Sequence, residues 1–226
     1  MQPTHLKSRD ERGDSTRRAL LEAALVAFAR DGFDNVSTRR LATLAGVNLA
    51  AIPYHFGSKE GLYRAVVQSL VDGMGRRVHE LVDPLHRDLD AGKVGPEELP
   101  RRAGDLLSGV AHLLLGSPLA ARGALIMARE QMAPTPAFDI AYQGFIKPLH
   151  ETLTALVAGA LGCSVDAPEA ILRAHGLLGL VLAFRVAPAT VSRRLGWEDY
   201  TPEHVTEVAA AVRELAVAAL RPESER

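Results

Sequence analysis

The chain has 226 residues, of which 47% are hydrophobic, 5% aromatic and 23% charged, and its formal net charge is −1. This composition is ordinary for a globular protein with a large core. The near-zero net charge excludes a polycation that binds nucleic acid indiscriminately, but it is compatible with a local basic surface that binds DNA specifically. Because Cys163 is the only cysteine, an internal disulfide and a paired-cysteine metal site are both excluded.

The start of the chain is polar. Residues 1–13 are charged and aperiodic, and we expect them to form a flexible N-terminal arm. They contain no apolar leader, and the longest apolar run, 176–184, is shorter than the roughly 18 residues that a membrane span needs. We therefore expect a soluble, cytoplasmic protein with no membrane partner.

A first helix is expected from residue 14 or 15 to Arg30, where the Asp31-Gly32 pair ends it. Its apolar residues recur at helical spacing, which predicts one buried stripe. We expect this stripe to form the floor for the short helices that follow. Its members are Leu21, Ala24, Leu25 and Phe28.

Residues 37–61 hold two short helical patterns separated by a glycine. Ser37 is placed to cap the first, in which Leu41, Leu44 and Ala45 form an apolar face before Gly46 breaks the helix. A helix, a short glycine turn and a second helix are typical of proteins that place the second helix in the DNA major groove.

The second short helix is expected over residues 49–56, with Asn48 as its cap, and Ser58 is expected to cap a third, longer helix. Val47, Ile52 and Phe56 can form its apolar underside. The remaining residues then face outward, as a DNA-reading helix requires.

Residues 53–62 read PYHFGSKEGL. This string resembles the Y-x-H-F-x-S-K-x-x-L motif that ends the DNA-binding domain in the TetR family of one-component transcription regulators. Pro53 departs from the motif, because many members have there an aromatic residue that contacts phosphate. We expect Tyr54 to take over that contact.

The resemblance and the expected exposure together predict the DNA-binding residues. Side chains facing base edges are expected to be Arg39, Asn48, Leu49, Ala50 and Ala51, the small ones through thymine methyl groups. Phosphate contacts are expected from Thr38, Arg40, Tyr54, His55 and Lys59.

The rest of the chain also has helical periodicity. A helix from Ser58 is expected to pass Val82 and stop at Asp83-Pro84, and residues 88–100 are expected to be a loop. Further helical patterns lie at about 101–116, 118–133, 136–162, 167–187 and 202–220, and no segment alternates like a strand. The sequence predicts an all-α fold of about nine helices, with a helix-turn-helix domain at 14–62 and a helical effector-binding and dimerisation domain at 63–226.

Two further segments resemble the CecR-like subgroup of the TetR family. They are REQMAPTPAFD at 129–139 and RRLGW at 193–197, and they imply a subgroup-specific C-terminal domain. The family resemblance also implies a homodimer formed by the last two long helices, about 167–187 and 202–220. Their apolar stripes, in the second case Val208, Val212, Leu215, Ala216 and Ala219, independently predict burial.

A small-molecule effector is implied by the same resemblance. Side chains that can line its pocket are His112, Met127, Glu130, Phe138, Tyr142 and His175. The same residues are also typical of an ordinary helical core, and both interpretations stay open at this point.

An enzyme is the main alternative class for a helical chain with eight histidines. The Glu-x-x-His pairs of di-iron bundles are absent from the sequence, as are the H-E-x-x-H, G-x-S-x-G, Walker and G-x-G-x-x-G motifs. We therefore expect no catalysis, no metal and no cofactor. The expected function is a ligand-responsive repressor released from a palindromic operator. The alternative is a helical protein-interaction module with a degenerate helix-turn-helix, an interpretation that rests on Pro53.

Overall fold

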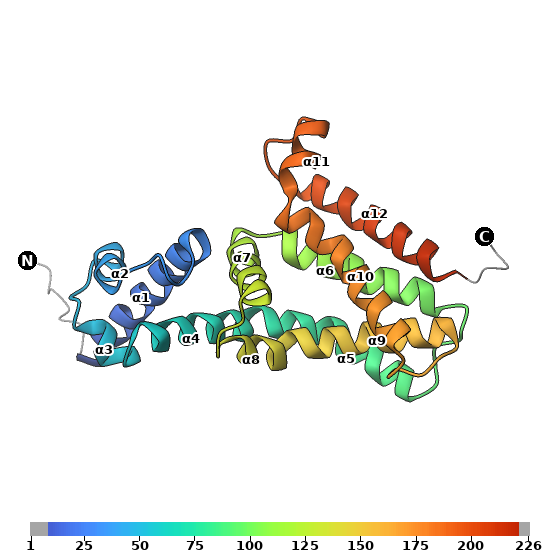
Figure 1. The fold of residues 1–226 in the computed structure, drawn as a ribbon, viewed down its shortest axis with the longest axis horizontal. Helices are drawn as coiled ribbons and strands as arrows, with labels where there is room; N and C mark the ends of the chain where they lie inside the picture. Colours follow the sequence, from blue (N-terminus) through green and yellow to red (C-terminus); the bar gives the residue numbers. More distant parts are fainter. Residues whose placement is uncertain (1–8, 222–226) are drawn as a thin grey trace, which may run out of the picture.

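The computed structural model describes residues 9–221, except for the side chains of residues 9–12, 118 and 119. Every regular element in this range is helical, which confirms the all-α prediction (Figure 1). The α-helices are α1 (Arg9–Asp31), α2 (Thr38–Ala45), α3 (Ala51–Phe56), α4 (Lys59–Leu70), α5 (Arg76–Asp90), α6 (Leu99–Leu115), α7 (Pro118–Met132), α8 (Phe138–Ala141), α9 (Lys147–Leu161), α10 (Pro168–Val186), α11 (Pro188–Leu195) and α12 (Pro202–Leu220). Two π turns, η1 (Val71–Gly75) and η2 (Tyr142–Ile146), join α4 to α5 and α8 to α9, so the described range holds ten continuous helices.

The first helix begins earlier than expected. α1 starts at Arg9 rather than at residue 14 or 15, so residues 9–13 of the expected arm are helical. Acidic residues at positions 10 and 11 suit the first turn of a helix, where the dipole is positive. Residues 1–8 of the expected arm lie outside the described range.

The α4–η1–α5 segment is one long rod that runs along the molecule and carries α1–α3 at one end (Figure 1). The expectation that it stops at Asp83-Pro84 was wrong, because α5 continues through Pro84 to Asp90. Val78 and Val82 are buried on its inner face, and that packing outweighs the one backbone hydrogen bond that proline removes. The loop predicted at 88–100 is accordingly shorter, since α5 ends at Asp90 and α6 begins at Leu99.

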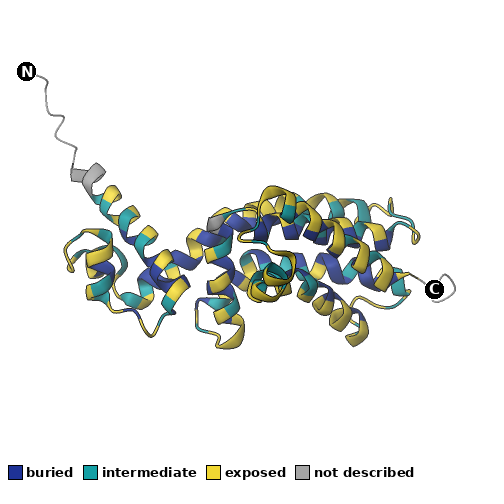
Figure 2. Ribbon diagram, turned by 90° about the horizontal axis from the view of Figure 1, so that it is seen from above, coloured by how far each residue is buried: buried dark blue, intermediate teal, exposed yellow. Residues whose placement is uncertain are grey.

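The C-terminal helices pack around α6. α12 lies along α6, and a Cβ atom at Gly104 would come within 2.9 Å of Val217 Cγ2, so glycine permits the close approach. α9 packs against both α6 and α10. Figure 2 shows the result, with buried residues where helices face one another and exposed residues on the outer faces.

The two π turns cross each other. A Cβ atom at Gly75 would lie 3.1 Å from the carbonyl oxygen of Gly144, and one at Gly144 would clash with Val71. Glycine at 75 and 144 therefore lets the long rod touch the α8–α9 segment directly.

The last helices differ from the expectation in two ways. α11 was not predicted, because it has only eight residues and none of them is buried. The stripe expected on α12 is buried at Val208, Val212 and Ala216, but Leu215 and Ala219 are exposed. Within residues 9–221, no single helix is long and apolar enough to cross a membrane. Two pairs of consecutive helices reach the required length and apolar composition when counted together, but each pair is sharply bent.

Candidate nucleic-acid interface

The floor of the N-terminal helices is the inner face of α1. Ala24 and Phe28 are fully buried there, together with Leu20, which the expected stripe did not include. Leu21 and Leu25 are only partly buried. α2 and α3 pack against this face, so the floor fixes the position of both short helices.

α2 begins and ends as the sequence predicts. The Ser37 Oγ atom accepts a hydrogen bond from the Arg40 amide at 3.2 Å, and Gly46 ends the helix with φ at 65°. The predicted apolar face was wrong at one position, because Leu44 is 54% exposed while Leu41 and its neighbour Ala42 are buried. Helical geometry places position 42, rather than 44, toward the floor.

α3 is shorter than expected. It begins at Ala51 rather than residue 49, and Asn48 instead closes a turn, its Oδ1 atom accepting from the Ala50 amide at 2.8 Å. The underside is confirmed, with Ile52 1% exposed and with Val47 and Phe56 packed against the core.

Pro53 occupies the third position of α3. The first four amides of a helix have no intrahelical acceptor, so proline costs no hydrogen bond at this position. This placement removes the backbone objection to a proline in α3.

The residues expected to read bases form one accessible stretch. Arg39, Asn48, Leu49 and Ala50 are exposed, and Ala51 is half-buried at the start of α3. The structure adds Leu44 and Pro53, which are also exposed on these two helices. Sequence reasoning had assigned Leu44 to the core, and its spacing from Leu41 gave no signal that it faces outward.

The expected phosphate contacts have different environments. Tyr54 is 83% exposed and meets the half-buried His55 edge to face at 4.8 Å, and Thr38 is half-buried beside the Ser37 cap. Arg40 pairs with Asp31 at 2.8 Å, while the Lys59 ammonium lies 4.2 Å from the centre of the Phe33 ring.

These two cations therefore have partners within the protein. The Arg30 and Arg40 guanidinium groups hold the pKa of the Asp31 carboxyl below its usual range, with Arg30 as the larger cause.

A buried hydrogen bond joins the long rod to the C-terminal helices. The Tyr63 hydroxyl donates to Glu130 Oε1 at 2.6 Å, and Thr135 donates to Glu130 from its amide and its hydroxyl. Glu130 is 2% exposed. The pKa of Tyr63 is raised, mainly because its hydroxyl is buried and secondly because it is bonded to this carboxylate. Beside it, Arg129 donates to the carbonyl oxygen of Arg30 at 3.1 Å. The N-terminal helices α1 and α4 are thus bonded to α7 at two points.

The six residues expected to line an effector pocket are not brought together. Glu130 takes part in the hydrogen bonds above, and Met127 is a buried core residue. Phe138 stacks on Tyr142 at 5.8 Å. His112 is exposed on α6, where its Nδ1 atom bonds to the Ser108 carbonyl oxygen.

His175 is exposed on α10, and its ring lies 5.8 Å from that of His150. The pKa of His150 is lowered, mainly because the ring is partly buried and secondly because of the charge of His175. Helical spacing shows which face is apolar but not which faces share a cavity, so the assignment of these six residues to an effector pocket stays a prediction. No group of three or more potential metal ligands is found among the described side chains.

Two family models match this sequence. Residues 20–66 match the N-terminal domain of the bacterial regulatory proteins of the tetR family, which covers α2, α3 and the start of α4. Residues 101–221 match the C-terminal domain of the HTH-type transcriptional dual regulator CecR. The chain is also 36% identical to the CecR regulator of Shigella flexneri over 195 residues, which cover 85% of both proteins.

The chain belongs to the TetR family. As a TetR-family regulator it carries a CecR-type C-terminal domain, as the segments at 129–139 and 193–197 predicted. A more distant relative, the regulator RutR of Escherichia coli K12, is 41% identical over 56 residues, about a quarter of each chain.

Solved structures of TetR-family proteins share the fold. A regulator from Rhodococcus RHA1 superposes with a TM-score of 0.65 at 14% identity, covering 95% of this chain and 98% of that one. PfmR from Thermus thermophilus gives a TM-score of 0.59 at 19% identity, covering 88% and 97%. These structures share the helical fold of residues 9–221, while the TetR-family and CecR matches of the sequence identify the chain as a DNA-binding transcription regulator.

Proposed function

We propose that two copies of this chain bind a palindromic operator through α2 and α3 and repress transcription until an effector releases them. The observation that carries the proposal is the exposed stretch on α2 and α3, held on a buried floor by Ile52 and Phe28. Arg39, Asn48, Leu49, Ala50 and Ala51 are proposed to face bases. Thr38, Arg40, Tyr54, His55 and Lys59 are proposed to contact phosphates.

The proposed domain division is 14–62 for DNA binding and 63–226 for effector binding and dimerisation. The α4–η1–α5 rod crosses this boundary without a break, so a tilt of its second half would move its first half. An effector that favours one tilt would change the spacing of the two recognition helices and lower operator affinity.

The proposed dimer uses α10 and α12. α10 is mostly apolar, yet in the single chain several of its large side chains are exposed, with Leu172 70% and Val186 55% accessible. Leu215 of α12 is also 54% exposed. An exposed apolar face on the helices that the family uses for dimerisation is best explained by a second copy, which would bury it in a two-fold interface.

The proposal implies a cytoplasmic location, where operator DNA lies, and no catalytic step. Its test is fluorescence anisotropy of the purified chain with labelled DNA from upstream of its own gene. Each titration is repeated with scrambled competitor at several salt concentrations. We expect tight, saturable binding that specific DNA competes away far better than scrambled DNA. Equal competition by both DNAs would contradict operator recognition.

A further inference from the structure

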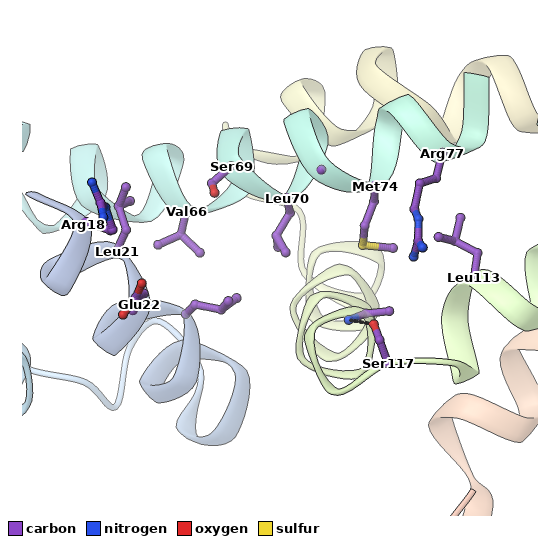
Figure 3. Close-up of a pocket in the computed structure, with 13 residues that line it drawn as sticks. Arg18, Leu21, Glu22, Val66, Ser69, Leu70, Met74, Arg77, Leu113 and Ser117 are labelled. Carbon is purple, nitrogen blue, oxygen red and sulfur yellow. Dashed lines mark hydrogen bonds between the residues drawn. The ribbon is translucent and has the colours of Figure 1, made fainter. Parts of the chain in front are cut away.

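A cavity lies where the DNA-binding helices meet the C-terminal helices. Its walls come from α1, from α4 and η1, and from the end of α6 with the start of α7 (Figure 3). Its volume is about 400 Å³, within the range of small-molecule sites. We call it the junction cavity. None of the six residues that the sequence suggested for an effector pocket lines it.

Most of the lining is apolar. Leu21 and Leu25 of α1 face Val66 and Leu70 of α4, and Met74 of η1 continues the wall toward Leu113 of α6. Leu21 and Leu25 are the two members of the α1 stripe that the floor leaves partly exposed. The cavity therefore offers a hydrocarbon surface drawn from both domains.

Charged groups lie at the ends of the junction cavity. Figure 3 shows Arg18 and Glu22 at the α1 end, and Arg77 with Ser117 at the opposite end near Leu113. Glu22 lies one helical turn from Arg18, so its carboxylate offsets that charge locally. Arg77 has no recorded hydrogen bond or ion pair with any described residue. Arg77, an exposed residue, therefore places a positive charge beside an apolar surface.

A π turn forms part of the cavity wall. η1 adds a wide turn to the rod at 71–75, and Gly73 on this turn lines the cavity. A Cβ atom at Gly73 would meet nothing within 4 Å, so the position opens into free space. π turns within α-helices occur frequently at functional sites, and this one lies at the centre of the rod that joins the domains.

We propose that the junction cavity is the binding site for a small amphipathic carboxylate. Its acid group pairs with Arg77 and its hydrocarbon part lies between α1 and η1. Arginine pairs with carboxylates through two parallel hydrogen bonds, and the apolar walls exclude a ligand that is polar throughout. A cation is disfavoured because the cavity ends carry two arginines and one glutamate. This inference deepens the regulator function proposed above, since it names the effector class and its site.

Occupancy of the junction cavity acts on both domains at once. The ligand touches α1 on one side and the α6–α7 corner on the other, so it fixes the angle between them. The hydrogen bonds from Tyr63 to Glu130 and from Arg129 to Arg30 connect the same helices, α4 and α1, to α7. We therefore expect the bound ligand to lower operator affinity.

The test is isothermal titration calorimetry of the full chain with decanoate, decanol and decyltrimethylammonium, which share a hydrocarbon chain and differ in charge. Decanoate should bind saturably and more tightly than the other two. Arg77→Gln should weaken decanoate binding about tenfold or more, the value of a lost charged hydrogen bond. Gly73→Leu should abolish binding by filling the cavity.

Matched controls separate the site from general effects. Arg76→Gln removes an adjacent arginine that does not line the cavity, and Gly73→Ala adds only one methyl group, so both should retain decanoate binding. Equal binding of the three ligands, or equal binding by all four variants, would overturn the proposal, as would absence of saturable binding to the wild-type chain. Operator binding measured without ligand is a separate readout, so its failure would overturn the regulator proposal alone.

Discussion

At the residue scale, the cations of the proposed DNA-binding surface differ in whether their side chains already have a partner within the protein. Arg39 is exposed and no hydrogen bond or ion pair of its side chain is recorded with a described residue, whereas Arg40 is paired with Asp31 and Lys59 lies over Phe33. A side chain that already has a partner must exchange it for a phosphate group, which reduces the free energy that this side chain contributes to DNA binding. Arg39 is therefore best placed for a base contact, whereas Lys59 is suited to placing a positive charge near the DNA phosphates.

Arg39→Ala and Lys59→Ala should affect DNA binding differently. Loss of a base contact by Arg39→Ala should weaken operator binding by about 1–3 kcal/mol and relax base preference. Lys59→Ala should weaken binding to all sequences and flatten the salt dependence. Anisotropy titrations against operator and scrambled DNA separate the two. If both variants bind the operator like wild type, this placement of α2 and α3 on DNA is wrong.

Tyr63→Phe should destabilise the fold by about 1–3 kcal/mol, because it leaves the buried Glu130 carboxylate without one of its donors. The ring contacts with Phe28 and Phe33 stay in place. Urea unfolding measures the change, and Tyr54→Phe is the control, since the exposed Tyr54 hydroxyl should contribute less than about 0.5 kcal/mol. Equal stability of Tyr63→Phe and wild type would show that the Tyr63–Glu130 bond contributes nothing.

At the element scale, the sequence predicts well where most helices lie, but it predicts poorly where they end and how they pack together. The caps at Ser37 and Ser58 and the buried Ile52 follow from local pattern, and the structure confirms them. The continuation of α5 through Pro84 does not follow, because tertiary packing outweighs a local helix breaker. The junction cavity could not be predicted either, since Leu21, Met74 and Leu113 meet only through the packing of three distant helices.

Pro53 and Pro84, which lie at different depths within their helices, give a matched comparison. Pro84→Ala should stabilise the protein by about 1–2 kcal/mol, because it restores a mid-helix hydrogen bond at an exposed position. Pro53→Ala should change stability by less than about 0.5 kcal/mol, because the third position of α3 needs no intrahelical amide. Thermal unfolding of both variants measures the difference. A larger gain from Pro53→Ala than from Pro84→Ala would contradict this account of α3.

At the scale of the whole molecule, the exposed face of α10 and α12 is the feature that a single chain leaves unexplained. Leu172, Val186 and Leu215 are all more than half exposed, and they lie on the helices proposed for dimerisation. Leu172→Arg should place a charge in the interface and weaken the dimer about a hundredfold or more. Met132→Arg is the control, because Met132 is 78% exposed on α7, outside this face. Sedimentation equilibrium of both variants gives the association constant, and an unchanged dimer in Leu172→Arg would place the interface elsewhere.

The central claim is that two copies of the chain hold their α3 helices on one palindromic operator. Native mass spectrometry of the protein with an operator duplex and with a single half-site tests it most directly. The account predicts two chains on the full operator for wild type and Met132→Arg, and loss of the two-chain complex in Leu172→Arg. One chain bound equally to both duplexes in all three proteins would contradict it.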